Sequence, residues 1–185
     1  MRDASAADRF LIRIKEPNLV MRAVLCHQPT THNMTTQTMA APVVTPTTGE
    51  KKNILGHTVT VKLRSDDAAG NYVFEVITAP GMGIPPHSHT DEDEVIYVQS
   101  GTFEVVIGNE TFIAGPGTWL NFKRPLPHGF KNIGDQPGKT LWFVDPGAKF
   151  EAFFNELGAF PPGPPDFPKV AALFAKYGMT ILPPR

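Results

Sequence analysis

Three histidines and one glutamate have the residue types and spacing of a metal-binding set. His87 and His89 are two residues apart, so on a strand both imidazoles would point to the same face. Glu94 opens the next predicted strand, and His128 lies on a later one. Inside a barrel, these side chains could hold one divalent first-row metal ion and leave coordination positions open. Two histidines at this spacing are by themselves more often a surface or core feature. The presence of Glu94 and His128 at positions where they could join the two histidines favours a metal site.

The other polar groups near this set are given plainer interpretations. The acidic run 91–93, Asp-Glu-Asp, could supply further ligands, but its polarity favours a solvated turn. His27 and His32 lie in a polar, threonine-rich stretch and His57 lies near a strand start, so we interpret all three as non-functional. The chain has no Gly-x-Ser-x-Gly segment, which argues against a serine hydrolase.

An apolar wall is predicted beside the metal-binding set. Period-two alternation from Glu94 places Ile96 and Val98 on the same strand face. Phe130 is two residues from His128 and should face the same way. Ile96, Val98 and Phe130 are therefore the predicted substrate pocket. Their apolar character favours an aromatic or otherwise apolar substrate over a sugar phosphate.

The spacing of these residues resembles the first motif of the cupin superfamily. That motif has a glycine, five residues, His-x-His, three or four residues, a glutamate, six residues and a second glycine. Its positions are filled here by Gly81, His87, His89, Glu94 and Gly101. Because the motif joins three residue types at fixed distances, the resemblance is specific.

The second cupin motif is matched in part. Gly117 lies eleven residues before His128, and Asn132 follows at the expected distance. The family's usual Pro-x-Gly is replaced by Lys-Arg-Pro at 123–125. This departure concerns the loop before His128 and leaves the ligand itself in place.

The resemblance implies a fold, a cofactor and a catalytic residue. The fold is all-β: a double-stranded β-helix, or jelly-roll cupin barrel. The cofactor is one divalent first-row transition metal, which could be Fe, Ni, Mn, Co, Cu or Zn. Glu94 is implied to be the catalytic residue, as ligand and proton acceptor in turn. The metal ligands carry over as His87, His89, Glu94 and His128.

A narrower resemblance implies an activity. Residues 114–118 and 145–154 are similar to segments of quercetin-dioxygenase-like single-domain cupins. The implied function is an oxygenase that uses dioxygen to open or cleave a small enolisable aromatic substrate, flavonol- or diketone-like. Two alternatives stay open: a metal- or small-molecule-binding barrel without turnover, and a redox-neutral metal-dependent isomerase or decarboxylase. The last would need inward-facing basic side chains, and only Lys123 and Arg124 can be placed nearby.

Short alternating segments must form the scaffold for these residues. They predict strands at 57–63, 72–78, 95–99, 102–107, 111–114, 118–122, 129–132 and 140–144. Gly108-Asn109 between two of these segments predicts a tight hairpin. Many short strands without intervening helices favour an antiparallel sandwich or barrel.

Helical patterns appear only near the C-terminus. A helix is predicted over 149–157 with Gly158 as its C-terminal cap, and a second one begins after Asp166 as N-cap. The two helices cannot form a core of their own, so we expect them on the outside or rim of the barrel. The side chains expected to cover barrel surface are Phe150, Phe153 and Phe154.

The length of 185 residues fits one domain with appendages. The predicted parts are a flexible N-terminal tail over 1–45, a cupin barrel over 46–147 and a C-terminal helical extension over 148–185. The tail is threonine-rich and has no steady periodicity. One hypothesis is that natural translation starts at Met34 or Met39, which the intact mass of the native protein would test.

Composition limits the partners. Lys+Arg 17 against Asp+Glu 18 gives a net charge of -1, so no broad nucleic-acid surface is expected. No apolar stretch approaches the roughly 18 residues that a membrane-spanning helix needs. The single cysteine, Cys26, cannot form an internal disulfide, which favours a cytoplasmic location. The expected partners are a small-molecule substrate and a second copy in a homodimer, because edge strands need covering.

Overall fold

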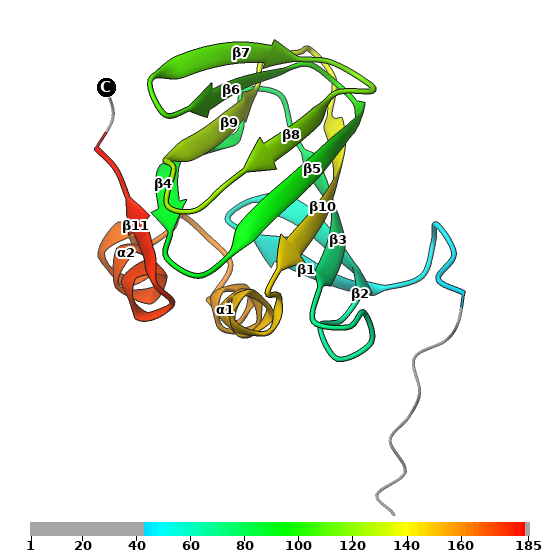
Figure 1. The fold of residues 1–185 in the computed structure, drawn as a ribbon, viewed down its shortest axis with the longest axis vertical. Helices are drawn as coiled ribbons and strands as arrows, with labels where there is room; N and C mark the ends of the chain where they lie inside the picture. The colour runs from blue at the N-terminus through cyan, green and yellow to red at the C-terminus, as the bar shows by residue number, and fades with distance from the viewer. Residues whose placement is uncertain (1–42, 184–185) are drawn as a thin grey trace, which may run out of the picture. The chain divides into compact units, whose positions relative to one another are not determined.

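A computed structural model describes residues 43–183 (Figure 1). Of the predicted tail, only residues 43–45 lie in this range, and they form neither helix nor strand. The rest of the tail and both candidate start residues lie outside the described residues. None of the helices described in this range is long and apolar enough to cross a membrane.

Two sheets, antiparallel throughout, form the barrel in Figure 1. The six-stranded sheet has the order β1 (Glu50–Ile54), β2 (His57–Leu63), β3 (Tyr72–Thr78), β10 (Gly138–Asp145), β5 (Asp93–Ser100) and β8 (Trp119–Phe122). The five-stranded sheet has the order β11 (Met179–Ile181), β4 (Gly83–His89), β9 (His128–Asn132), β6 (Phe103–Ile107) and β7 (Glu110–Ala114). The predicted fold class, an all-β jelly-roll barrel with C-terminal helices, is confirmed.

Alternation along β5 sorts its side chains between the barrel interior and the outside. Glu94, Ile96 and Val98 are each at most 1% exposed, whereas Val95 and Tyr97 are half-buried on the other face. This is the arrangement that the sequence pattern predicts. A slip of one residue in the register would move Glu94 out of the interior, so burial of the apolar side chains also places the carboxylate.

Three strands are additional to the predicted set. β1 and β11 are short, and no alternation marks them in the sequence. β4 carries two of the histidines and was inferred only from their spacing, because Pro85 and Pro86 interrupt its pattern. Proline cannot donate a backbone hydrogen bond. The pairing of β4 with β9 accordingly shifts register between Ile84 and His87.

The two predicted helices are present as α1 (Ala148–Gly158) and α2 (Phe167–Lys176). Asp166 is confirmed as the N-cap of α2, since its side chain accepts a hydrogen bond from a backbone N–H in the first turn. The prediction of Gly158 as a cap is wrong. It is the last residue of α1, and Ala159 is the C-cap.

Both helices lie across one end of the barrel (Figure 1). Phe150, Phe153 and Phe154 of α1 are at most 7% exposed. Their rings reach the barrel core, where Phe74 of β3 lies 6.0 Å from Phe150 and 5.0 Å from Phe154 between ring centroids. The helices therefore close the interior as well as covering the rim. The C-terminal extension that contains both helices also contains β11, which pairs with β4 beside the histidines.

Candidate metal centre

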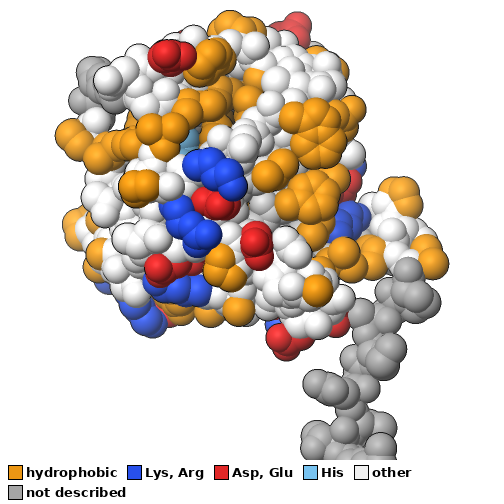
Figure 2. Space-filling model, viewed as in Figure 1, with side chains coloured by type: hydrophobic (Ala, Val, Ile, Leu, Met, Phe, Trp, Pro, Cys, Tyr) orange, Lys and Arg blue, Asp and Glu red, His pale blue; other side chains and the backbone are white. Residues whose placement is uncertain are grey.

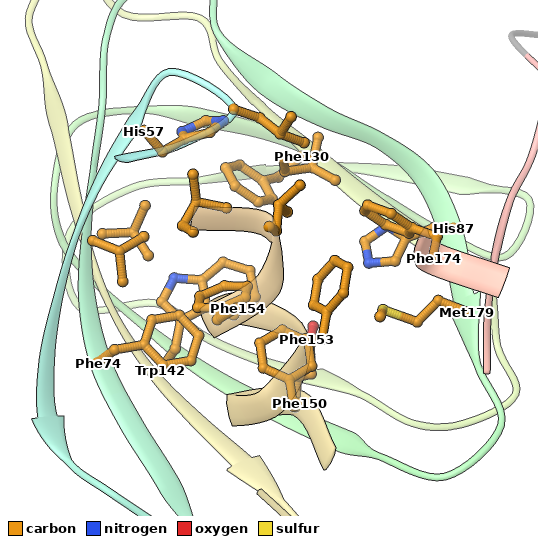
Figure 3. A pocket seen from close by; sticks show the side chains of 17 residues that line it. His57, Phe74, His87, Phe130, Trp142, Phe150, Phe153, Phe154, Phe174 and Met179 are labelled. Atoms are coloured by element: carbon orange, nitrogen blue, oxygen red, sulfur yellow. The ribbon is translucent and has the colours of Figure 1, made fainter. Parts of the chain in front are cut away.

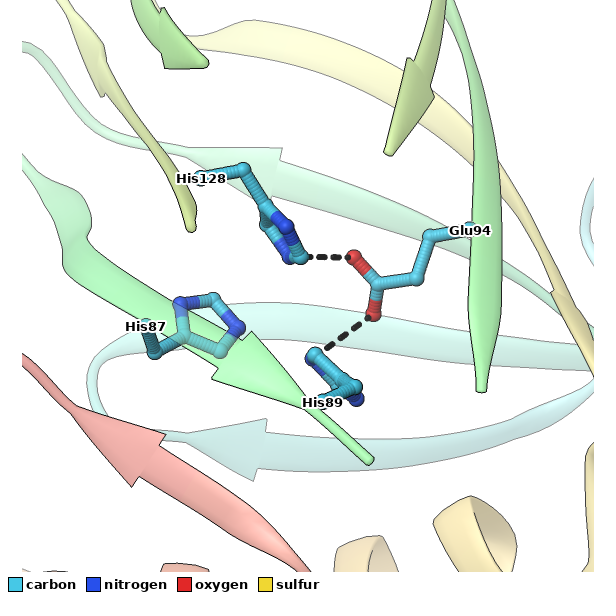
Figure 4. A group of neighbouring side chains, drawn as sticks. All are labelled: His87, His89, Glu94 and His128. Atoms are coloured by element: carbon cyan, nitrogen blue, oxygen red, sulfur yellow. Dashed lines mark ion pairs between the residues drawn. The ribbon is translucent and has the colours of Figure 1, made fainter. Parts of the chain in front are cut away.

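One buried cluster is assembled from both sheets (Figure 4). His87 and His89 come from β4, and His128 comes from β9, where it pairs directly with His87. Glu94 reaches them from β5 in the facing sheet. All four side chains are at most 7% exposed, and their ligand atoms lie within 4.8 Å of one another. We call these residues the histidine–glutamate cluster.

Glu94 lies between two imidazoles of the cluster. Its Oε1 is 3.7 Å from His89 Nε2, and its Oε2 is 3.3 Å from His128 Nε2 (Figure 4). The ring of His87 completes the group, with its centroid 4.6 Å from that of His128 and 5.0 Å from that of His89. The structure thus brings together all four residues that the sequence spacing singles out.

Backbone carbonyls orient two of the imidazoles. His87 Nδ1 lies 3.1 Å from the carbonyl oxygen of Pro85, and His128 Nδ1 lies 3.0 Å from that of Leu126. A carbonyl oxygen can only accept a hydrogen bond, so Nδ1 carries the proton and donates it. The Nε2 atom of each ring is then left with a free lone pair on the side of the cluster.

Burial and neighbouring groups lower the pKa values of Glu94 and His87, two members of the cluster. Burial alone would raise the pKa of Glu94, but the three imidazoles, His128 most strongly, outweigh it and lower the pKa to about 2. Burial, reinforced by His128, lowers the pKa of His87 to about 3. At neutral pH Glu94 is therefore ionised and His87 is neutral, which are the forms that bind a metal ion.

The unsatisfied atoms of the cluster fit a bound cation. Within the described residues, His89 Nε2, His128 Nε2 and Glu94 Oε2 are buried and have no hydrogen-bond partner. A buried polar group without a partner costs about 1–3 kcal/mol. A divalent first-row ion would accept these lone pairs, and three nitrogens with one oxygen are donors that such ions bind. The cluster could therefore hold a metal ion, whose identity stays open.

An apolar cavity of about 60 Å³ lies next to the cluster (Figure 3). His87 and Glu94 form part of its lining. Aromatic and aliphatic side chains from both sheets and both helices make up nearly all the rest, among them Phe130 of β9, Phe153 of α1 and Phe174 of α2. None of the described lysines or arginines lines this cavity.

One of the three predicted pocket residues lines the cavity. Phe130 does so and is 8% exposed. Ile96 and Val98 face the interior but are packed in the core, at 1% and 0% exposed, and do not border the cavity. Alternation identifies the interior face of a strand. It does not tell which interior positions border open space, because that depends on side chains from other elements.

The interpretation of the acidic run as a solvated turn is wrong at Glu92. This residue is 1% exposed, and its Oε2 lies 3.2 Å from His89 Nδ1. Asp91 beside it is exposed, as predicted. Only the position of Glu92 in the sequence indicates that it could be buried. Glu92 and Glu94 are two residues apart and so can share a face of an extended chain.

His57 is buried and borders the cavity, although its sequence context gives no sign of a role. It is 2% exposed, and its Nδ1 lies 3.1 Å from the hydroxyl oxygen of Thr78. Burial lowers the pKa of His57, so its imidazole is neutral at neutral pH. Figure 3 shows it across the cavity from His87. The cavity therefore has a second polar group away from the cluster.

Comparison with known families supports the resemblance of this chain to the cupin superfamily. Residues 74–144 match the family model described as "Cupin domain". This segment runs from β3 to β10 and contains the whole histidine–glutamate cluster.

Two curated relatives match a shorter stretch of the chain. The "Polyketide synthase CurC" of Streptomyces cyaneus is 29% identical over 79 residues, which are 43% of this chain and 51% of the relative. "Protein SchB" of Streptomyces halstedii is 27% identical over 79 residues, covering 43% and 57%. The chain therefore spans about half the length of the curated relatives it matches.

Solved structures show the same fold. The polyketide cyclase RemF from Streptomyces resistomycificus aligns with a TM-score of 0.50 and 24% identity over 56% of this chain and 78% of its own. An RmlC-like cupin from Shewanella frigidimarina NCIMB 400 aligns with a TM-score of 0.50 and 16% identity over 58% and 92%. At these identities the likeness concerns the cupin barrel alone.

Proposed function

We propose that this chain is a metal-dependent cupin enzyme: an oxygenase, quercetin-dioxygenase-like, that converts a small enolisable aromatic substrate with dioxygen. The observation that carries the proposal is the position of the histidine–glutamate cluster beside an apolar cavity. A divalent metal ion held by the cluster would supply a Lewis acid that favours the ionised form of a substrate hydroxyl.

The cavity walls would bind and orient an apolar ring. Phe130, Phe153 and Phe174 offer aromatic faces, and the cluster offers the polar atoms at one side. A substrate ring would therefore lie among the phenylalanines with its hydroxyl toward Glu94. An engineered apolar cavity of about 150 Å³ is large enough to bind benzene. The cavity of about 60 Å³ is thus smaller than an aromatic substrate, and side chains of α1 or α2 must move to admit one.

Glu94 would hold and release the proton of the substrate hydroxyl. The imidazoles around it keep its pKa low, at about 2, so it is a weak base while those contacts last. It can accept a proton only after its carboxylate has turned away from His89 and His128. The arriving substrate oxygen would take the place that the carboxylate leaves.

A second candidate function is the redox-neutral conversion of an enolisable polyketide. The similarity to the curated relative named as a polyketide synthase favours it, and so does the apolar cavity, which suits a polyketide as well as a flavonol. A small polar acid is a poorer substrate for this cavity. Lys123 and Arg124, the basic residues considered for that role, both pair with Asp93 at the surface.

The test of the proposal compares turnover with and without dioxygen. Purified protein is analysed for its metal content, reloaded with each first-row dication and supplied with a flavonol or an aromatic 1,3-diketone. We expect the substrate to disappear only when dioxygen is present, with matching oxygen uptake. Equal turnover under nitrogen would favour the redox-neutral candidate instead, and substrate binding without turnover would favour a non-catalytic binding protein.

His128→Ala is the control for the site. It removes one of four ligands, so metal content should fall strongly while the barrel still folds. Ile133→Ala changes an exposed residue just after β9 and should leave metal content unchanged. Unchanged metal content in the His128 variant would show that the metal lies elsewhere.

A further inference from the structure

Glu92 is a buried carboxylate, and no lysine or arginine of the described residues pairs with it. It is 1% exposed, and its one ion-pair contact is with His89. Its neighbours differ: Asp91 pairs with Lys149, and Asp93 pairs with Lys123. An ionised group removed from water is strongly destabilising unless a partner charge compensates it. Among the described residues only His89 makes an ion-pair contact with Glu92, so the compensating charge comes either from a protonated His89 or from a cation that His89 binds.

The contact of Glu92 determines which nitrogen of His89 faces the cluster. Its Oε2 lies 3.2 Å from His89 Nδ1 and, as an ionised carboxylate, can only accept the proton. Nδ1 therefore donates, and Nε2 presents its lone pair 3.7 Å from Glu94 Oε1. The other two imidazoles use backbone carbonyls for this purpose. His89 is the one member of the cluster oriented by a charged group.

Glu92 also changes the charge of the site. With three neutral imidazoles, Glu94 alone would leave a bound dication with a net positive charge. Glu92 adds a second buried negative charge in contact with the ligand His89, so a dication makes the whole assembly neutral. Charges interact strongly in a buried environment of low dielectric constant. The two negative charges of Glu92 and Glu94 therefore match the charge of a divalent ion.

We propose that Glu92 is a positioning residue of the metal centre: it fixes His89 with Nε2 toward the cluster and supplies the second negative charge that balances a dication. The inference rests on the proposed metal-dependent function. It goes beyond the ligand set, because Glu92 itself does not face the cluster.

Three substitutions separate the two effects of Glu92. Glu92→Gln keeps the size and an acceptor oxygen for His89 Nδ1 but removes the charge. Glu92→Ala removes the acceptor as well, so His89 can present either nitrogen. Asp91→Asn is the matched control, since it removes the same charge from the exposed adjacent residue. Metal-free protein of each variant is titrated with Co²⁺ against a chelating dye.

We expect the Glu92→Gln variant to bind Co²⁺ about 10- to 100-fold more weakly than the unchanged protein, which is the usual effect of losing an outer partner of a ligand histidine. Glu92→Ala should bind more weakly still and change the absorption bands of the bound Co²⁺, and Asp91→Asn should match the unchanged protein. Thermal unfolding of the metal-free variants shows separately that each one folds.

Two results would overturn the inference in different ways. If Glu92→Gln and Glu92→Ala fold and bind Co²⁺ as tightly as Asp91→Asn, Glu92 has no role at the centre, although the metal site stands. If the unchanged protein itself binds no Co²⁺ or other first-row dication, the proposed function fails and this inference falls with it.

Discussion

Glu94 shows how the chemistry of the site depends on single residues. It is fully buried, yet the neighbouring imidazoles keep its pKa at about 2, so it stays ionised. A carboxylate with so low a pKa is a good ligand and a poor base. The two roles implied for Glu94 therefore exclude each other at any one moment, and a substitution can separate them.

Glu94→Gln should weaken metal binding modestly and reduce turnover severely. Glutamine keeps the size and one oxygen donor but loses the charge and the basicity, while three imidazoles remain. Turnover should fall by roughly 100-fold or more, the usual contribution of a positioned acid–base group. Metal stoichiometry and initial rate are measured on one preparation, with metal resupplied.

Glu104→Gln, on the exposed side of β6, is the control and should alter neither quantity. Near-normal rates in the metal-loaded Glu94 variant would exclude Glu94 as the base. Equal losses of metal and of rate would leave it as a ligand only.

Single residues also show how far the sequence can predict this site. The cluster could be predicted because strand periodicity fixes the side on which His87, His89 and Glu94 lie. The burial of Glu92 could not be predicted, because a polar residue in an acidic run looks the same whether it is solvated or paired with His89. That Ile96 does not border the cavity could not be predicted either, because much of the lining comes from α1 and α2, far along the chain.

At the scale of elements, α1 is held to the barrel by a buried carboxylate. Glu151 is 7% exposed and accepts hydrogen bonds from the backbone nitrogen of Ser65 at 2.9 Å and from its hydroxyl at 2.8 Å. It also pairs with Arg64 at 2.8 Å. Both partners lie just after β2, so this contact joins the helix to the six-stranded sheet.

Glu151→Ala should lower the free energy of unfolding by about 1–3 kcal/mol, because it leaves a buried backbone N–H without its acceptor. Asn155→Ala changes an exposed residue of the same helix and should have little effect. Urea denaturation of both variants measures the difference. Equal losses in the two variants would mean that the Ser65 contact does not anchor α1.

Phe174 of α2 closes the cavity on the side of the cluster. Its ring packs edge-on against His87, 5.9 Å between centroids, and against Phe153 of α1 at 4.9 Å. Phe174→Leu keeps an apolar side chain but opens this contact, so a chelator should remove the bound metal faster. Phe167→Leu, at a residue 73% exposed in the same helix, should not change the rate. Chelator-dependent metal release at equal rates in both variants would mean that α2 does not control access.

The elements differ in how well the sequence predicts them. β5 alternates between buried and half-buried residues over most of its length, and the sequence predicts both β5 and β9 within two residues of their limits. The prolines of β4 conceal a strand that the histidine spacing alone reveals. The amphipathic patterns of α1 and α2 identify an apolar face but not its target, because the open end of a barrel exists only once distant strands have paired.

At the scale of the whole molecule, two strand edges are left open on one side. β7 is an edge of the five-stranded sheet and β8 is an edge of the six-stranded sheet. The turn 115–118 joins them, so they lie close together. Ile113 and Trp119 on these strands are 64% and 61% exposed, and Figure 2 shows apolar side chains gathered over β5 and β8. Open apolar edges of this kind favour association with another chain.

We predict that a second copy of the chain covers these edges in a homodimer. The unchanged protein should have twice the mass of one chain by light scattering after gel filtration. Ile113→Lys combined with Trp119→Lys places two charges on the exposed edge strands and should give a monomer, because burying unpaired lysines is costly. Ile133→Lys, at an exposed residue between β9 and β10, is the control and should remain a dimer. Unchanged protein that stays monomeric at every concentration would contradict the prediction, and a dimer that survives the double substitution would place the interface elsewhere.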